Sequence, residues 1–285
     1  MGTLPLQQAA DGLIRLTGSG PPAGPTFLCR RRAHRASAPQ QRRQGAPVQR
    51  GPDLPLSGYA PKMTTDPSTW EPAPLAEVAD LFSRAGCTWW IAGGHAIELA
   101  VGHAIREHGD IDVLLLREDQ HAAQYVLAGW EWWAADPPGK LRPWLPDEYL
   151  PMGVHDIWCR PGPGKPWRLQ IMLDEAQDGL WVSRRDTAVH RPIAELGAIS
   201  TAGIPYLRPE VQLYYKAKNP RPKDESDLTA ALPTLGPTQR IWLAEAILAT
   251  YGDHPWVHRL EVPARHRRPP QADLLDDLPY DWEQR

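Results

Sequence analysis

Two short motifs in the middle of the chain have residue types that suit phosphoryl chemistry. Gly93-Gly94 breaks one apolar stretch, and Asp110-Ile111-Asp112 opens the next. Side chains along a strand repeat every two residues, so both carboxylates should face one side, about 7 Å apart. Mg²⁺ prefers a few carboxylates together with phosphate oxygens, and glycines at a helix start let a phosphate approach backbone N–H groups. The two motifs together indicate a site for a metal ion and a nucleotide.

Each motif also has a purely structural interpretation. A Gly-Gly pair is commonly a turn, and an Asp-x-Asp pair is commonly a solvated strand end. The order of strand, Gly-Gly, helix, loop, Asp-x-Asp and strand is much rarer by chance than either motif alone. It is this order that supports the functional interpretation.

The elements that must position these motifs follow from the spacing of apolar residues. Helices are expected at residues 75–85, 95–101, 118–128, 210–218, 225–232 and 238–251. Strands are expected at residues 87–92, 111–116, 130–133, 154–160, 167–173 and 181–184. The Pro/Gly-rich stretch 161–166 predicts a hairpin, and 134–153 is expected to be loop. The fold class is therefore mixed α/β (α+β), with a C-terminal helical part.

Composition suggests that the folded part is smaller than the 285 residues of the chain. Residues 1–62 hold nine Lys or Arg and two Asp, a net charge of +7. Because the whole chain has a net charge of −3, residues 63–285 have a net charge of −10. This basic, Pro-rich stretch is expected to be disordered, with a nucleic-acid arm and a transit peptide as alternatives. A further hypothesis is that it lies upstream of a true start at Met63. We expect a linker at 63–74, an α/β core at 75–205, a helical part at 206–255 and a mobile tail at 256–285.

Other sequence features bear on compartment and partners. Cys29, Cys87 and Cys159 are too far apart for a C-x-x-C pair, and no apolar run approaches the roughly 18–20 residues of a membrane span. A cytoplasmic protein with no membrane partner is therefore expected. The −10 balance of residues 63–285 argues against extensive nucleic-acid contact, which needs a basic surface.

Residues 90–97 (WIAGGHAI) and 106–112 (REHGDID) resemble the polymerase-β-type nucleotidyltransferase superfamily, most closely its aminoglycoside adenylyltransferase-like branch. In that branch a GG-[WH]-A-I element precedes an R-x-H-x-D-I-D element at this spacing. The likeness continues through 206–218 and 221–227. It implies a small mixed nucleotidyltransferase sheet with flanking helices. It also implies transfer of a nucleoside monophosphate from an NTP, typically ATP, to a hydroxyl of a small molecule such as an aminoglycoside-like antibiotic.

The resemblance implies roles for the motif residues. Asp110 and Asp112 would bind Mg²⁺, which orients the NTP phosphates and neutralises developing charge, and Gly93 and Gly94 would touch the phosphates. Family members usually supply a third acid from the following hairpin, where this chain has Gln170. An amide cannot accept a proton at neutral pH.

Two acids could take the place of the missing carboxylate. Asp174 shares a strand face with Gln170 but lies about 13 Å along it, and Asp156 is on the adjacent strand. We take Asp174 as the candidate catalytic acid. A solvated strand-end position is the alternative for either residue.

Basic and aromatic residues complete the candidate site. For nucleotide binding we consider His95, Arg106, Lys216 and Lys223, each of which could instead serve as a cap or in an ordinary ion pair. In one interpretation, Asp224 and Asp227 orient the two lysines. The tryptophans at 130, 132, 133 and 144 are expected in the core, with an acceptor pocket as the alternative. A zinc site near Glu98, His103 and His108 lacks the usual ligand spacing.

Three functions are compatible with these features. The first is a Mg²⁺-dependent nucleotidyltransferase acting on a small molecule. The second is a catalytically degenerate nucleotide-binding module, which Gln170 would favour. The third is a toxin–antitoxin-type nucleotidyltransferase that modifies a macromolecule.

Overall fold

The computed structural model describes residues 69–267 of the chain, so the predictions for residues 1–62 and for Met63 lie outside the described residues. The helices are α1 (Leu75–Phe82), α2 (Gly93–Val101), α3 (His121–Val126), α4 (Pro209–Lys216), α5 (Pro222–Ala231), α6 (Pro237–Tyr251) and α7 (Pro255–Arg259). Short 3-10 turns are η1 (Arg117–Asp119), η2 (Ile193–Glu195), η3 (Leu232–Thr234) and η4 (Ala264–His266). None of the helices within 69–267 is long and apolar enough to cross a membrane.

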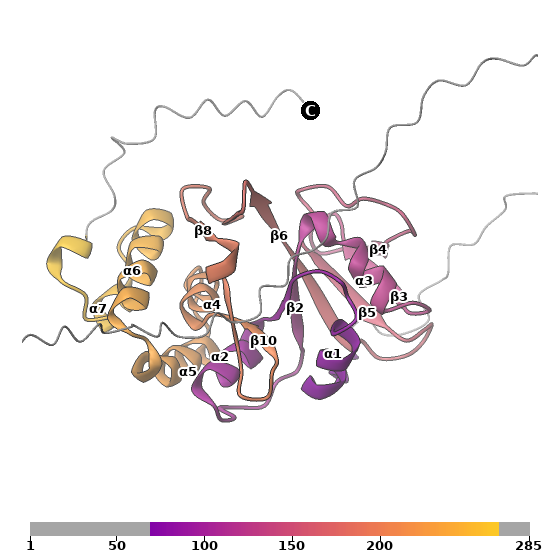
Figure 1. Cartoon of the computed structure of the whole chain (residues 1–285), viewed down its shortest axis with the longest axis horizontal. Helices are drawn as coiled ribbons and strands as arrows, with labels where there is room; N and C mark the ends of the chain where they lie inside the picture. The colour runs from indigo at the N-terminus through magenta and orange to yellow at the C-terminus, as the bar shows by residue number, and fades with distance from the viewer. Residues whose placement is uncertain (1–68, 268–285) are drawn as a thin grey trace, which may run out of the picture.

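The strands form one mixed sheet (Figure 1). They are β1 (Trp89–Ile91), β2 (Asp112–Leu116), β3 (Glu131–Ala135), β4 (Leu141–Pro143), β5 (Asp156–Arg160), β6 (Leu169–Gln177), β7 (Leu180–Val182), β8 (His190–Pro192), β9 (Gly197–Ile199) and β10 (Pro205–Leu207). Their order is β4-β3-β5-β6-β2-β1-β10-β9, with β7 paired to β6 and β8 to β7. Strand β2 is central, antiparallel to β1 and parallel to β6. The predicted fold class is confirmed.

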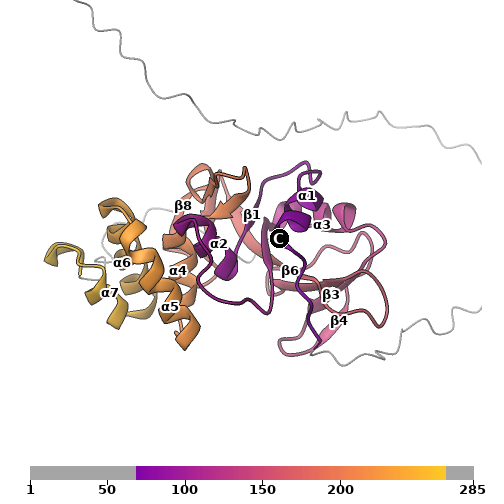
Figure 2. The same cartoon turned by 90° about the horizontal axis from the view of Figure 1, so that it is seen from below.

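The side-chain alternation of β2 divides the core between the two faces of the sheet. Val113 and Leu115 face a cluster that includes Val78 of α1 and Ala123 of α3. Leu114 and Leu116 face the opposite cluster, built with α2, α4, α5, α6 and α7. The two views show these C-terminal helices gathered beside α2 at one end of the molecule, with β3 and β4 at the other (Figures 1 and 2). Strands β3, β4 and β5 therefore lie at the end of the sheet away from the C-terminal helices.

Several predicted elements need correction. The predicted β5–β6 hairpin is present, but the expected loop 134–153 contains β4, which pairs with β3. Strands β8, β9 and β10 were not predicted, because three-residue strands are too short to show a period. The chain is also folded just after Pro255, where α7 forms and Trp256 is buried, within the stretch 256–285 that was expected to be a mobile tail. The end of the expected linker forms hydrogen bonds with the residues just before β6, because the Ala73 N–H donates to Arg168 O.

Candidate active site

Three carboxylates and one amide meet on one face of the sheet. Asp110 lies two residues before Asp112, which is the first residue of β2. Gln170 of β6 is the register partner of Asp112, so both side chains point to the same face. Asp156 of β5 pairs with Met172, two residues after Gln170, and accepts a 3.0 Å hydrogen bond from Gln170 Nε2 to its Oδ1. Sequence position alone therefore placed Asp110 and Asp112 together, and the sheet adds Asp156.

The Asp112 carboxylate is held in an unfavourable electrostatic setting. Burial, followed by repulsion from Asp110, raises the pKa of Asp112 from its ordinary value of 3.8 to about 7, and Asp156 adds to the rise. Lys216 and Lys223 oppose this shift without cancelling it. Carboxylates that repel each other at a partly buried site fit a cation, which would relieve the repulsion.

Asp174, the predicted third acid, does not lie at this cluster. It is the register partner of Leu116, four residues along β2 from Asp112, because each strand residue adds about 3.3 Å. Its buried Oδ2 accepts hydrogen bonds from Trp181 Nε1 (2.8 Å) and Tyr215 OH (2.6 Å). The structure therefore gives Asp174 a place in the core and leaves Asp156 as the acid beside Asp110 and Asp112.

The two glycines have different neighbours. Gly93 adopts φ +67°, and a Cβ there would collide with the Asp112 carboxylate. A Cβ at Gly94 would collide with Arg106 and His108. The Gly93 N–H donates to Gln212 Oε1 of α4 at 2.8 Å, so it is not available to a phosphate. Within residues 69–267, the next free N–H groups at the start of α2 belong to Gly94 and His95.

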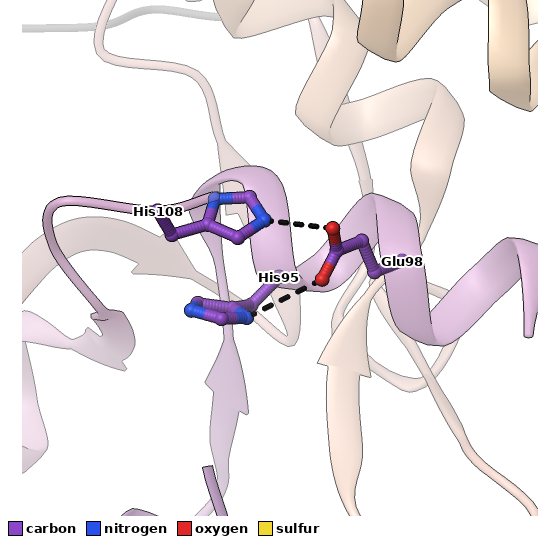
Figure 3. Close-up of side chains that lie close together, drawn as sticks. All are labelled: His95, Glu98 and His108. Carbon is purple, nitrogen blue, oxygen red and sulfur yellow. Dashed lines mark ion pairs between the residues drawn. The ribbon is translucent and has the colours of Figure 1, made fainter. Parts of the chain in front are cut away.

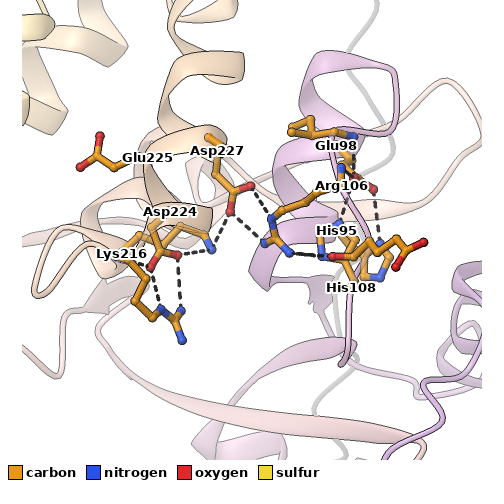
Figure 4. A network of polar contacts seen from close by, with 12 residues as sticks. His95, Glu98, Arg106, His108, Lys216, Asp224, Glu225 and Asp227 are labelled. Carbon is orange, nitrogen blue, oxygen red and sulfur yellow. Dashed lines mark hydrogen bonds and ion pairs between the residues drawn. The ribbon is translucent and has the colours of Figure 1, made fainter.

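Arg106, predicted to bind nucleotide, takes part in a buried ion network (Figure 4). Its guanidinium donates to both oxygens of Asp227, from Nε at 3.0 Å and Nη2 at 3.1 Å. Lys216 Nζ bridges Asp227 at 2.9 Å and Asp224 at 3.1 Å. Burial acts to raise the pKa of Asp224, but hydrogen bonds from Arg221 and Lys216 outweigh it and lower that pKa to about 2.

Lys223, the other predicted lysine, lies half-buried at the start of α5. Lys223 forms no ion pair with residues 69–267, yet its charge acts on Asp112. The sequence interpretation that Asp224 and Asp227 orient both lysines therefore applies to Lys216, which they contact directly. Lys223 keeps its ammonium group available near the carboxylates.

His95, Glu98 and His108 form a second cluster of possible metal ligands (Figure 3). His108 Nε2 lies 2.9 Å from Glu98 Oε1, and His95 Nδ1 lies 3.7 Å from Glu98 Oε2. Arg106 Nη1 lies 3.0 Å from His108 Nδ1, and an arginine can only donate, so the proton of neutral His108 sits on Nε2. That nitrogen then has no lone pair for a metal, and we interpret the cluster as a hydrogen-bonded brace between α2 and the Arg106 loop.

The protonation of His95 fits this brace. Burial, followed by the neighbouring His108, lowers the pKa of His95 below its ordinary value of 6.5. The two rings are tilted by 35° to each other, with centroids 4.1 Å apart. Near neutral pH the His95 ring is therefore uncharged, and its backbone N–H, at the start of α2, is the part best placed for an anion.

A cavity of about 470 Å³ opens beside Asp156 and Gln170. Its other lining residues are Ala135, Gly139, Lys140, Leu141 and Trp158. The tryptophans considered from the sequence do not line it; Trp144, for example, is buried in the core cluster under α1 and α3. Sequence reasoning missed Trp158 and Lys140, because only the pairing of β3, β4 and β5 brings them to one wall.

Residues 74–133 match the family model described as aminoglycoside-2''-adenylyltransferase. This stretch contains Gly93-Gly94 and Asp110-Ile111-Asp112, so the resemblance seen in the motifs is confirmed there. The chain is similar to nucleotidyltransferases of the aminoglycoside and lincosamide adenylyltransferase kind.

Two solved structures are among those to which part of the chain is similar. One is ANT(2'')-Ia in complex with adenylyl-2''-tobramycin, with TM-score 0.39 and 14% identity, covering 60% of this chain and 94% of that chain. The other is the lincosamide antibiotic adenylyltransferase LnuA, lincomycin-bound, with TM-score 0.39 and 18% identity, covering 58% of this chain and 100% of that chain. No curated protein matches the sequence.

Proposed function

We propose that this protein transfers a nucleoside monophosphate from an NTP, ATP by preference, to a hydroxyl group of a small-molecule acceptor of the antibiotic type. The observation that carries the proposal is the group of Asp110, Asp112 and Asp156 on one face of the sheet, where burial, followed by repulsion from Asp110, raises the pKa of Asp112 to about 7. The family matched by residues 74–133 is named for adenylyl transfer to an aminoglycoside, which supports the reaction type.

Asp110 and Asp112 would hold Mg²⁺, and their repulsion is the feature of the chain that a divalent cation fits. A bound Mg²⁺ would supply charge neutralisation at the phosphates and a fixed orientation for the attack on the α-phosphorus. Two carboxylates with phosphate oxygens are the ligand type that Mg²⁺ prefers.

Backbone N–H groups and a lysine near the carboxylates would bind the phosphates. The N–H groups of Gly94 and His95 point from the start of α2, where the helix dipole favours an anion. Lys223 adds a cation close enough to act on Asp112. Arg106 and Lys216, whose charges are shared with Asp227 and Asp224, keep the loop and the helices in place.

Asp156 is the group that would take the proton of the acceptor hydroxyl. It lines the cavity, and Gln170 Nε2 fixes its Oδ1, leaving Oδ2 for the acceptor. In the transfer, the acceptor oxygen bonds to the α-phosphorus, the bond from that phosphorus to the pyrophosphate oxygen breaks, and the hydroxyl proton goes to Asp156. Gln170 then has a supporting role and need not be an acid.

The test is a pyrophosphate-release assay with ATP and Mg²⁺ across hydroxyl-bearing antibiotics, combined with calorimetry of ATP binding. Release should depend on Mg²⁺ and disappear in Asp112→Asn. Asp156→Asn should keep ATP binding but lose turnover, which separates the base from the metal ligands. ATP binding without turnover for any acceptor would instead favour a nucleotide-binding module, and labelling of a macromolecule in cell extract would favour a different acceptor class.

A further inference from the structure

The cavity at β3, β4 and β5 shares a wall with the carboxylate cluster. Strand alternation and register put Leu141, Ala135 and Trp158 on the same sheet face as Gln170 and therefore as Asp112. The residue that connects the cavity to the cluster is Asp156, which belongs to both. A molecule in the cavity would thus present its nearest atoms to the oxygen that we propose as the proton acceptor.

The cavity wall offers a fixed aromatic surface. Trp158 is half-buried and makes edge contacts with Trp70, at 5.0 Å and 70°, and with Trp167, at 5.6 Å and 73° between ring planes. These contacts hold its ring in one orientation. Together with Ala135 and Leu141 it forms an apolar surface against which a flat ring can stack.

The charges around the cavity do not suit a ligand with several positive groups. Among the described residues that line it, Asp156 is the one carboxylate and Lys140 the one ammonium group, and Lys140 is exposed without an ion pair inside residues 69–267. Nearby acids are already neutralised, because Arg142 pairs with Asp136 at 2.8 Å and with Glu148 at 2.7 Å. Ammonium groups of a ligand would therefore meet Lys140 and find Asp156 as the single carboxylate of the lining, so several positive charges would not all be paired there.

We infer that this cavity binds the acceptor, and that the acceptor is a hydroxylated small molecule with an apolar ring face and without clustered positive charges. That the ligand is an acceptor rests on the proposed nucleotidyl transfer. That the cavity binds a ligand is argued from the shape and lining of the cavity alone. A volume of about 470 Å³ lies within the usual range for sites that hold small organic ligands.

Saturation-transfer NMR on the full chain tests the chemistry of the site with three probes. Phenyl β-glucoside is uncharged, phenyl β-glucuronide is anionic, and tobramycin is polycationic. Both phenyl glycosides should receive saturation, most strongly at their aromatic protons, and tobramycin should not displace them. Absence of transfer to both phenyl glycosides, or their displacement by tobramycin, would overturn the inference.

Substitutions of residues that line the cavity test whether the saturation-transfer signal comes from probe bound there. Trp158→Ala should weaken phenyl glucoside binding at least about tenfold, and Trp158→Phe should stay within about threefold of wild type, since it keeps a ring face. Lys140→Glu should weaken glucuronide binding and admit tobramycin. Lys165→Glu, an exposed lysine in the β5–β6 turn outside the cavity, is the matched control and should change neither. Equal effects of Lys140→Glu and Lys165→Glu would contradict the assignment.

Calorimetry of ATP with Mg²⁺ on the same preparations distinguishes a failure of the cavity as acceptor site from a failure of the proposed nucleotidyl transfer. Probe binding that depends on Trp158, without any ATP binding, would retain the cavity as a ligand site and reject the proposed transfer. Nucleotidyl transfer that Trp158→Ala and Lys140→Glu leave unchanged would retain the transfer and reject this cavity as the acceptor site.

Discussion

Two groups of aspartates lie on either side of Gly93-Gly94, at the start of α2, and differ in their charge partners and in the direction of their pKa shifts. Asp224 and Asp227 contact Arg106, Lys216 or Arg221, and the pKa of Asp224 is lowered to about 2. In the other group, Asp112 faces Asp110 and Asp156, and its pKa is raised to about 7. One group is neutralised by the protein's own cations. The other is left repelling itself, which is the arrangement expected of acids reserved for an external cation.

This difference also separates stability from function. Buried carboxylates that have cationic partners hold helices and loops together, and removing a partner leaves an uncompensated charge. Carboxylates that repel one another cost folding free energy, so their presence is better explained by ligand binding. Substitutions in the two groups should therefore have opposite effects on the fold.

The largest expected effect is on activity. Asp112→Asn should lower kcat/KM for nucleotidyl transfer by about 10³-fold or more, since metal stabilisation of the transition state contributes several kcal/mol. Pyrophosphate release measures it. Asp253→Asn, on an almost fully exposed side chain, is the control and should keep full activity. Comparable activity of both variants would remove Asp112 from the metal site.

The second-largest effect is expected on the free energy of unfolding, for the group of Asp224 and Asp227, which have cationic partners. Lys216→Met leaves Asp224 and Asp227 with one cationic partner fewer and should lower the free energy of unfolding by about 3–5 kcal/mol. Urea denaturation followed by circular dichroism measures the change. Arg221→Ala, whose guanidinium is mostly exposed, should cost less than about 1 kcal/mol. A loss for Lys216→Met no larger than for Arg221→Ala would show that the buried network does not stabilise the fold.

A smaller effect is expected at the loop between the two groups. Gly93→Ala and Gly102→Ala both place a side chain at positive φ, +67° and +83°, which costs about 1–2 kcal/mol each. Only at Gly93 would the new Cβ also collide with Asp112. Gly93→Ala should therefore be the more destabilising in thermal unfolding and should also weaken Mg²⁺ binding in calorimetry. Equal behaviour of the two variants would mean that the contact with Asp112 is not close.

The smallest effect is a pH trend in metal-free protein. Because the native pKa of Asp112, about 7, exceeds its ordinary value of 3.8, the native state binds more protons between these values. Stability should therefore fall as pH rises from about 4 to about 7, by on the order of 1–2 kcal/mol after solvent screening.

Urea titrations in a chelator at a series of pH values measure this trend. Asp112→Asn should flatten it and should be more stable than wild type at neutral pH. For Asp224, whose pKa is lowered to about 2, the sign is reversed: its stabilisation is present above pH 3.8 and is lost as pH falls toward 2. A wild-type stability that rises between pH 4 and 7 with the same slope in Asp112→Asn would contradict the assigned repulsion.

The sequence predicted the parts of the site that are local in the chain. Gly93, Gly94, Asp110 and Asp112 belong to two short motifs around one central strand, and strand periodicity was enough to orient the carboxylates. Asp174, the predicted third acid, lies in the core, four residues along the sheet from Asp112. The choice between Asp174 and Asp156 depends on the register of β5 and β6 against β2, which no local pattern specifies.

Residues that act through tertiary contacts were also beyond the sequence. Gln212 is an ordinary residue of an expected helix, and only the packing of α4 against α2 brings its amide to the Gly93 N–H. Trp158 looked like one tryptophan among 13, and Lys140 like a loop lysine. Their common cavity exists because β4, a strand of three residues, pairs with β3.

The hydrogen bond from the Gly93 N–H to Gln212 has a consequence for dividing the protein. Strand β10 pairs with β1 inside the sheet, and α4, which follows it, supplies the acceptor for the first N–H group of α2. The helices after residue 205 thus help to fix the start of α2. A fragment that ends near residue 205 would lose the sheet edge beside β1 together with the amide that fixes Gly93, so it should not keep the start of α2 in its present position.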